Sequence, residues 1–267
     1  MKTDAFNARN LRKTVLDMAF SGSTVHIPCA FSLIEIMAVL YRDHLMVGES
    51  AQDPNRDFLA LSKGHGVMAQ YACLYELGWL SEADVRNYFA DGTRLKGLSD
   101  AHVGGLEVTS GSLGHGLSVG VGLALGCKLK KTKQQVYAIV GDGECNEGAI
   151  WEALLFASHW KLDNLCVIVD ANGYQAMGTT DQVMNLSDLG AKFKAFGFDT
   201  VVVDGHDEKQ LNKSFEDFKT SKNGRPKAVV ANTIKGKGVS FMEGDNTWHY
   251  TRLSPTTYES ALKELGF

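Results

Sequence analysis

The middle of the chain switches between the two periods that mark strands and helices. Residues 135–140 are a short β-branched apolar run that stops at a Gly-Asp-Gly turn at 141–143, which is the pattern of a buried parallel strand. Residues 148–160 then repeat apolar side chains at helical spacing, and residues 165–169 form a second apolar run. A strand, a helix and a strand in this length of chain predict a right-handed βαβ unit.

The rest of the chain alternates in the same way. Ser32 is the expected N-cap of one helix, with Glu35 completing a capping box. Strands alternating with helices predict a single α/β domain over residues 1–267, with a doubly wound, mainly parallel sheet flanked by helices. The further helices are expected at 5–20, 32–44, 67–77, 81–89, 113–130, 188–196, 207–220 and from about 256. The further strands are expected at 58–61, 198–203 and 227–232. These elements are separated by a break at 21–28 and by loops at 91–115, 175–187 and most of the chain after 235.

Two polar residues follow the two central strands. Asp142 leaves the end of the first and Asn172 the end of the second, and open α/β sheets bind ligands at that edge. The carboxylate of Asp142, the amide oxygen of Asn172 and the backbone carbonyl of Tyr174 are hard oxygen ligands that suit Mg²⁺, with Ca²⁺ or Mn²⁺ as alternatives. Gly141 and Gly143 let a phosphate approach the backbone before the following helix. The predicted occupant is a metal-bridged diphosphate, and the alternative is an ordinary Asp-Gly turn.

Composition narrows the class of protein. The net charge of −4 gives no electrostatic reason to expect nucleic acid or an anionic membrane as a partner. The five cysteines are scattered and contain no Cys-x-x-Cys pair, which indicates free thiols rather than disulfides or a zinc site. Residues 1–5 do not resemble a signal peptide, and no apolar run approaches the length of a membrane span. These features predict a cytoplasmic protein.

Six further polar motifs accompany the Gly-Asp-Gly turn and its later asparagine: Leu-Ser-Lys-Gly-His-Gly at 61–66, Gly-Ser-Leu-Gly-His-Gly-Leu-Ser at 111–118, Glu-Gly-Ala-Ile-Trp-Glu at 147–152, Lys-Leu-Asp-Asn-Leu at 161–165, Val-Asp-Gly-His-Asp at 203–207 and Lys-Gly-Lys-Gly-Val-Ser-Phe-Met-Glu at 235–243. Taken together, in order along nearly the whole chain, these motifs resemble the diphosphate-binding half of transketolase. This resemblance implies the thiamine-diphosphate-binding fold, thiamine diphosphate as cofactor, and transfer of a two-carbon ketol unit from a ketose donor to an aldose acceptor, both sugars or sugar phosphates.

Thiamine chemistry also needs a second half-site, which holds the aminopyrimidine ring and supplies a glutamate to it. The chain carries only the half that binds the diphosphate and metal. The resemblance therefore implies the N-terminal, diphosphate-binding (PP) subunit of a split transketolase. The pyrimidine-binding and C-terminal domains are expected on a separate chain, joined in an active α2β2 heterotetramer.

Three histidines are candidates for work in the substrate channel. In the family, the histidine matching His65 lines the channel, the one matching His26 contacts substrate and aids proton transfer, and the one matching His249 lies near the diphosphate and the donor. His65 and His249 are therefore also expected to contact the cofactor. Around His26 and His249 the family glycines are replaced, and plain structural or surface roles are the alternative.

Four further residues take roles from the resemblance. Gly111 and Leu113 match residues beside the cofactor, although Leu113, like His115, also fits an ordinary helix start. Glu147 and Glu152 match two acids of a buried proton path between active sites. Their alternative role is that of surface carboxylates near a helix N-terminus.

One departure from the family concerns the substrate. Leu98 stands where the family often has a histidine that contacts the hydroxyl groups of a ketose donor. A leucine makes no hydrogen bond and a more apolar pocket, so the hypothesis is a donor other than an ordinary sugar phosphate, with fewer hydroxyl groups. The alternative is that His102 takes over the contact.

Two other functions stay open at this point. One is a different thiamine enzyme, either the α subunit of the decarboxylating component of a 2-oxoacid dehydrogenase or an acyl or ketol transferase of specialised sugar metabolism. The motifs at 62–66 and 235–241 favour transketolase over the dehydrogenase. The other is a cofactor-binding scaffold without catalysis, against which the intact ligand set argues.

Overall fold

A computed structural model describes residues 5–22, 25–221 and 223–267. The strands are β1 (Phe58–Leu61), β2 (Val136–Gly141), β3 (Leu165–Ala171), β4 (Asp199–Asp204) and β5 (Lys227–Asn232). The helices are α1 (Ala8–Ser21), α2 (Ile27–Phe31), α3 (Ile34–Val39), α4 (Val67–Glu76), α5 (Glu82–Arg86), α6 (His115–Lys130), α7 (Gly148–His159), α8 (Thr180–Met184), α9 (Leu189–Ala195), α10 (Glu208–Thr220) and α11 (Pro255–Glu264), with a π-helical turn η1 (Leu40–His44) and 3₁₀ turns η2 (Gly64–Gly66), η3 (Gly143–Asn146) and η4 (Asn246–Trp248).

The five strands form one parallel sheet in the order β1-β2-β3-β5-β4. The predicted βαβ unit is β2, α7 and β3, and its two strands are neighbours in the sheet. Their register pairs Gly141 with Asp170, so Asp142 and Asn172 leave the sheet side by side. The predicted parallel α/β fold is confirmed.

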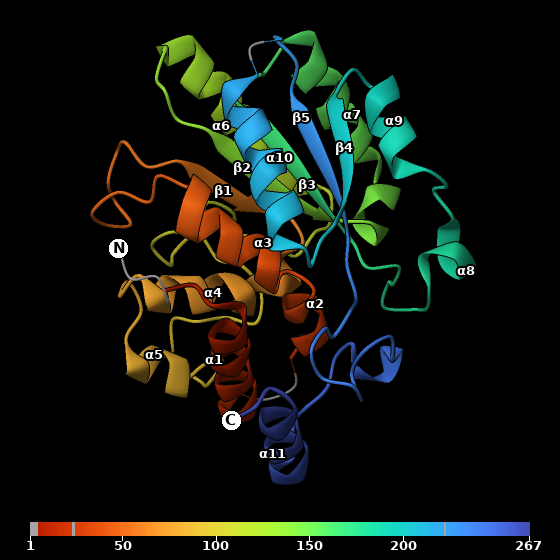
Figure 1. The fold of residues 1–267 in the computed structure, drawn as a ribbon. Coiled ribbons are helices and arrows are strands. Elements are labelled where there is room, and N and C mark those ends of the chain that lie inside the picture. Colours follow the sequence, from red (N-terminus) through yellow and green to blue (C-terminus); the bar gives the residue numbers. More distant parts are fainter. Residues whose placement is uncertain (1–4, 23–24, 222) are drawn as a thin grey trace.

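Side chains alternate between two apolar layers, one on each face of the sheet. Along β2, Tyr137 and Ile139 enter one layer, while Val136, Ala138 and Val140 enter the other. Figure 1 shows α3 and α10 on one face and α6, α7 and α9 behind the other. This alternation is what the period of two in a strand produces when helices cover both faces.

The helix expected at 113–130 is α6, which is rich in glycine, and its small residues permit close packing where it crosses β1 and β2. A Cβ on Gly116 would lie 2.4 Å from the Cα of Ser62, and one on Gly120 would lie 3.3 Å from Ala138. Close contact with the sheet therefore compensates for the low helix propensity of glycine.

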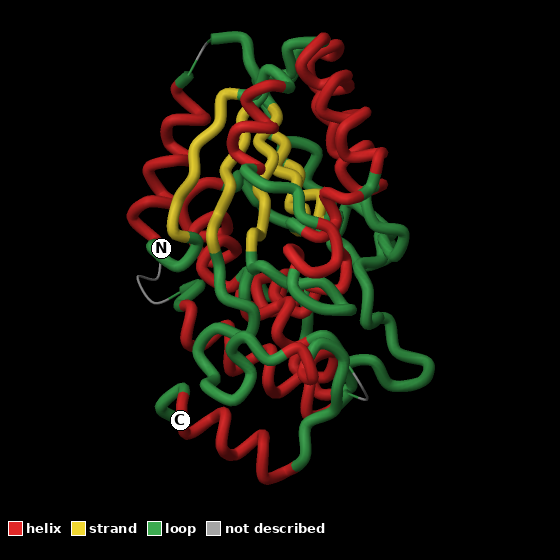
Figure 2. Tube along the Cα trace, turned by 90° about the vertical axis from the view of Figure 1, so that its right-hand side faces the viewer, coloured by secondary structure: helices red, strands yellow, loops and turns green. Residues whose placement is uncertain are grey.

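Several helices lie beyond the sheet instead of on its faces. Helix α1 packs on α2, α4, α5 and α11, and Figure 1 shows these helices below the strands, with α11 farthest from the sheet. Figure 2 likewise shows the strands toward one end of the molecule and the C-terminal helix at the other. The tail after β5 descends to this end, where Val25 pairs with Thr251. None of the helices among the described residues has both the length and the apolar character that crossing a membrane requires.

The predicted capping box at residues 32–35 is wrong. The segment forms α2 from Ile27, with Pro28 in its first turn, then α3 and the π-helical turn η1. Ser32 Oγ donates to the carbonyl of Cys29 (3.2 Å) and to Asp170 Oδ2 (2.6 Å), and the Glu35 carboxylate binds Arg12. Tertiary partners therefore take both side chains away from local capping.

Two other boundaries differ from the prediction. Helix α5 ends at Arg86 instead of Phe89, and α8 lies inside the predicted loop at 175–187, held by a capping box between Thr179 and Gln182. The loop at 91–115 is confirmed, since no helix or strand forms between Asn87 and Gly114. Residues 1–4, tested for a signal peptide, and 23–24, within the predicted break, lie outside the described residues.

Candidate active site

A cavity of about 450 Å³ opens at the carboxyl ends of β2 and β3. Except for Glu152, every residue singled out from the sequence as a site residue lines it. The lining residues are His26, Cys29, Lys63, His65, Leu98, Gly111, Leu113, Gly141, Asp142, Gly143, Glu144, Asn146, Glu147, Asn172, Tyr174, Gln175, Ala176, Met177 and His249.

The Asp142 carboxylate is buried where β2 meets η3. Its Oδ1 accepts the Gly143 N–H (2.8 Å), and its Oδ2 accepts the Gly173 N–H (2.6 Å) from the loop after β3. In the same loop Asn172 Oδ1 accepts the Tyr174 N–H (3.1 Å). Burial, together with the charge of Asp170, raises the pKa of Asp142 to about 6, because the described residues give this carboxylate N–H donors but no ion-pair partner.

These residues fit a metal-bridged diphosphate. A buried carboxylate without a cationic partner is what a divalent cation neutralises. Asn146 Oδ1 and Gln175 Nε2 line the same cavity and, among the described residues, have no hydrogen-bond partner. A Cβ on Gly143 would lie 2.5 Å from Gln175 Cγ, so a larger residue there would have to displace the Gln175 side chain. No cluster of three His, Cys, Asp or Glu side chains suited to a metal occurs in the described residues, so a cation here would depend on amide, carbonyl and phosphate oxygens.

A buried ion pair forms the floor beneath Asn172. Lys63 Nζ binds the fully buried Asp170 carboxylate, which also accepts hydrogen bonds from Thr233 Oγ1 and, at 3.3 Å, from Asn172 Nδ2. Although burial opposes ionisation of both groups, their mutual attraction lowers the pKa of Asp170 and raises that of Lys63. The pair therefore orients Asn172, turning its amide oxygen toward the Tyr174 N–H.

Glu144 joins three segments around the cavity. Its Oε1 accepts the Ser62 hydroxyl and the Gly114 N–H (2.8 Å), and its Oε2 accepts the Gly141 N–H (3.0 Å). Burial raises the pKa of Glu144. Sequence reasoning assigned no role to Glu144, Lys63 or Asp170. Asp170 carries a signal that could have found it, because it is a charged residue within the apolar strand β3 and buried charges need partners.

The three predicted histidines come together at the other end of the cavity. The ring centroid of His26 lies 5.2 Å from that of His65 and 5.1 Å from that of His249. Burial, reinforced by the Lys235 charge, lowers the pKa of both His26 and His249 to about 4, and burial also lowers the pKa of His65 well below its usual value. All three rings are therefore neutral at pH 7.

Lys235 places a positive charge beside these histidines, and sequence reasoning assigned it no role. Its Nζ lies 2.9 Å from His249 Nδ1 and 2.6 Å from Asn246 Oδ1, and 5.4 Å from the ring centroid of Tyr174. Burial lowers the pKa of Lys235, with a further contribution from Lys63. Because an ammonium only donates, it fixes Nδ1 of His249 as an acceptor and leaves the ring proton on Nε2.

Leu98 lies in the cavity wall, whereas His102 does not. His102 has 92% of its side chain exposed and binds the neighbouring Asp100 at 2.6 Å. Leu98 also lines an apolar annex of about 340 Å³, together with Val25, His26, Phe89, Lys96, Gly97 and Tyr250. The wall next to His26 thus offers a substrate apolar contact rather than hydrogen bonds.

The two predicted acids of α7 are both exposed on this chain. Glu147 lines the cavity and precedes the first residue of α7, and Glu152 lies on the helix outside the cavity. The described residues therefore do not bury either carboxylate.

The sequence matches the transketolase, thiamine diphosphate binding domain family over residues 3–267. The chain belongs to the transketolase family. An apulose-4-phosphate transketolase subunit of Phocaeicola vulgatus is 36% identical over 256 residues, which cover 96% of this chain and 91% of that relative. The 6-deoxy-6-sulfo-D-fructose transketolase subunit SqwG of a Clostridium species is 35% identical over 260 residues, covering 97% and 94%.

Solved transketolases share the fold. The enzyme from Campylobacter jejuni superposes with a TM-score of 0.90 at 28% identity, and the one from Leishmania mexicana with 0.87 at 29% identity. The chain covers 43% and 40% of those longer chains. The prediction of an N-terminal transketolase subunit that depends on thiamine diphosphate and transfers ketol units is confirmed.

Proposed function

We propose that this chain, joined to a separate chain with the pyrimidine-binding domain, transfers a two-carbon ketol unit from a ketose donor to an aldose acceptor. The observation that carries the proposal is the cavity itself. At one end lies the buried Asp142 carboxylate, which has no ion-pair partner among the described residues, and at the other lie three neutral histidines. A metal-bridged diphosphate fits the first end and a polyhydroxylated substrate the second.

Each end has its own task. Asp142, the Asn172 amide oxygen and the Tyr174 carbonyl would hold Mg²⁺, with Ca²⁺ or Mn²⁺ as substitutes. Thiamine diphosphate, when bound, would supply carbanion chemistry and an electron sink for cleavage of the donor's carbon–carbon bond. Gly111 and Leu113 would contact this cofactor beside Gly141 and Gly143.

The histidines would handle substrate hydroxyl groups. His26, His65 and His249 are neutral, so each ring can accept a proton at one nitrogen and donate at the other. Lys235 orients His249 so that Nε2–H is its donor. Glu147 and Glu152 are assigned to a proton path that forms only in the assembly, because both are exposed here.

The partner chain is part of the proposal. The subunits from Phocaeicola and Clostridium have nearly this length, whereas the solved transketolases are more than twice as long. Apolar side chains are exposed on the neighbouring helices α6 and α7 and on the residue that follows α7, as is typical of an interface: Val119, Leu129, Leu155, Phe156 and Trp160. We propose an α2β2 heterotetramer in the cytoplasm, where the five buried, free cysteines stay reduced.

Donor identity follows from Leu98. Its apolar wall favours a donor or acceptor with fewer hydroxyl groups beside His26, since a buried hydroxyl without a partner is costly. The named relatives act on modified sugars, apulose 4-phosphate and 6-deoxy-6-sulfofructose, which supports a specialised ketose here. His102 is exposed and bonded to Asp100, which argues against its replacing the missing contact.

The experiment is co-purification with the product of the neighbouring gene, followed by thiamine diphosphate and Mg²⁺ titrations with and without that partner. We expect tight binding only in the mixture and its loss in Asp142→Ala. A mixture that does not bind the cofactor would contradict the proposal, whereas binding without turnover of any donor would indicate a cofactor-binding scaffold.

A donor screen on the mixture separates the remaining alternatives. Ketose turnover supports the proposal, and 2-oxoacid turnover would identify a decarboxylating enzyme instead. In Leu98→His, turnover of ordinary ketose phosphates should rise relative to deoxy or sulfonated ketoses. An unchanged donor ratio would remove Leu98 as the determinant.

A further inference from the structure

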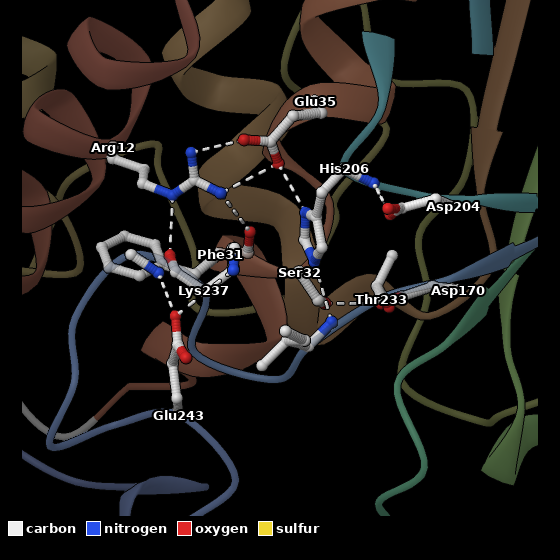
Figure 3. Close-up of polar contacts among 12 residues, drawn as sticks. Arg12, Phe31, Ser32, Glu35, Asp170, Asp204, His206, Thr233, Lys237 and Glu243 are labelled. Carbon is white, nitrogen blue, oxygen red and sulfur yellow. Dashed lines mark hydrogen bonds and ion pairs between the residues drawn. The ribbon is translucent and has the colours of Figure 1, made fainter. Parts of the chain in front are cut away.

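A buried polar cluster outside the cavity joins three segments of the chain (Figure 3). The Arg12 guanidinium on α1 binds the Glu35 carboxylate on α3 through two hydrogen bonds of 2.7 and 2.9 Å. His206, in the turn after β4, lies with Nδ1 2.9 Å from Glu35 Oε2. The three side chains are only 7–11% exposed, and none lines the cavity. We call them the Arg12–Glu35–His206 cluster.

The cluster holds the tail segment at residues 234–237 on both sides of Lys235. His206 Nε2 accepts the Ile234 N–H at 2.8 Å, and Arg12 Nε donates to the Lys237 carbonyl at 2.7 Å. Because Nε2 accepts, the proton of a neutral His206 lies on Nδ1 and is donated to Glu35. Lys235 is therefore anchored through its own chain neighbours.

The neighbouring residues of this segment are anchored as well. Thr233 Oγ1 donates to Asp170, and the Gly236 N–H donates to the Pro28 carbonyl at 3.1 Å. Gly236 has a φ of +83°, and a Cβ there would lie 2.4 Å from the Met242 carbonyl oxygen. Backbone and side-chain bonds thus fix the segment from 233 to 237 next to the active site.

The same cluster also reaches the helix that carries His26. Arg12 Nη2 donates to the Phe31 carbonyl, the last residue of α2, at 3.3 Å, and His26 is the N-cap of α2. One guanidinium therefore binds the two segments that bring His26 to the cavity and Lys235 to His249.

We propose that the Arg12–Glu35–His206 cluster positions Lys235 on His249 and thereby sets the tautomer of His249 used in catalysis. Its members are positioning residues, since they touch neither cavity nor substrate. The use in catalysis rests on the proposed function, whereas the link to Lys235 and His249 is a property of this chain. A buried ion pair is weak grounds for a purely stabilising role. Here Glu35 binds both other members, and Arg12 and His206 direct their remaining hydrogen bonds to the tail segment and α2.

The test uses two substitutions at one position. In His206→Gln the amide oxygen can occupy the place of Nε2 and still accept the Ile234 N–H. In His206→Asn the amide can occupy the place of Nδ1 and donate to Glu35, but the Ile234 N–H loses its acceptor. The two variants thus differ mainly in whether the tail segment stays anchored.

The decisive measurement is long-range ¹H–¹⁵N NMR of the histidine rings at pH 7 in the chain labelled with ¹⁵N-histidine. We expect a single His249 tautomer, protonated at Nε2, in the wild type and in His206→Gln, and a mixture of both tautomers in His206→Asn. A His249 spectrum of wild-type form in a folded His206→Asn variant would overturn the proposal. If the asparagine variant does not fold, Glu35→Gln replaces it. This substitution keeps the side-chain volume but removes the charge that orients Arg12 and His206. A His249 spectrum of wild-type form in folded Glu35→Gln would then overturn the proposal.

The kinetic measurement uses the complex with the partner chain. We expect kcat to fall about 10-fold to 100-fold in His206→Asn, as for loss of an outer-shell partner, with recovery in His206→Gln and with the KM for the ketose donor changed by less than about 3-fold. Equal kcat in all three proteins would overturn the catalytic use. The NMR result needs no cofactor, so it stands even if the complex lacks ketol transfer.

Discussion

The two ends of the cavity take their side chains from different kinds of structure. At the diphosphate end, Asp142 and Asn172 leave adjacent parallel strands, and the Lys63–Asp170 pair beneath them is almost completely buried. At the histidine end, His26 comes from the N-cap of α2, His65 from the turn η2 and His249 from the tail after β5. The first end is fixed by strand register, and the second by contacts between segments far apart in the sequence.

This difference should affect how much each end contributes to the stability of the fold. Strand register brings the first end together as soon as the sheet forms, and its charges lie in a low-dielectric interior where loss of one partner is costly. The histidine end depends on the Val25–Thr251 bridge, the Gly236–Pro28 bond and Lys235. Damage there should change function more than stability.

The largest expected effect is at the floor of the diphosphate end. In Lys63→Met the buried Asp170 loses its cation, so the free energy of unfolding should fall by about 3–5 kcal/mol, measured by urea denaturation. The control is Lys213→Met, whose pair with Asp217 is exposed and should cost less than about 1 kcal/mol. Equal losses of unfolding free energy in the two variants would show that the Lys63–Asp170 pair stabilises the protein no more than a surface ion pair does.

Removal of the proposed metal ligand comes next. Asp142→Ala should weaken binding of thiamine diphosphate with Mg²⁺ by about 100-fold or more, since ligand loss should exceed the 10-fold to 100-fold typical of an outer-shell partner. Calorimetric titration of the complex measures it. The exposed Asp217→Asn serves as the control and should bind as the wild type does. Retained affinity in Asp142→Ala would move the metal site elsewhere.

The pH dependence of the free chain should differ in sign between the two ends. The folded pKa of His26 is about 4 against an ordinary value of 6.5, so the unfolded state binds more protons in this window and stability falls as pH drops from 6.5 to 4. His26→Gln should lose less stability than the wild type between pH 7 and 4.5, by about 1 kcal/mol after allowance for solvent screening.

The metal-free diphosphate end should do the opposite. The pKa of Asp142 is raised to about 6 from 3.8, so the folded state binds more protons here and this contribution to stability falls as pH rises from 3.8 to 6. Asp142→Asn should remove that slope. If the urea midpoints of both variants and of the wild type changed with pH in the same way across pH 4–7, the pKa shifts assigned to His26 and Asp142 would be contradicted.

The smallest effect on stability is expected on α7. Glu152 is exposed, so Glu152→Gln should change the free energy of unfolding by less than about 0.5 kcal/mol. Turnover by the complex should nonetheless fall if this acid belongs to a proton path formed with the partner. Full activity in Glu152→Gln, beside an unchanged unfolding curve, would leave the residue a surface carboxylate.

Much of the diphosphate end could be predicted because its residues directly follow strands that short stretches of sequence reveal. A β-branched run that stops at Gly-Asp-Gly marks a strand end, and parallel neighbours put the ends of β2 and β3 at one edge of the sheet. The histidines were predicted only through the resemblance to transketolase. No pattern in the sequence predicts that the ring centroid of His249 lies 5.1 Å from that of His26.

The sequence by itself determined the strands, the parallel α/β fold, the Asp142 and Asn172 pair and the family. Tertiary structure alone decided what Ser32, Glu35 and Lys235 do. Local pattern assigned the first two to a helix cap, yet Ser32 binds Asp170 and Glu35 binds Arg12 and His206. Periodicity reports which face of an element is apolar, whereas a buried polar group must find its partner wherever the folded chain provides one.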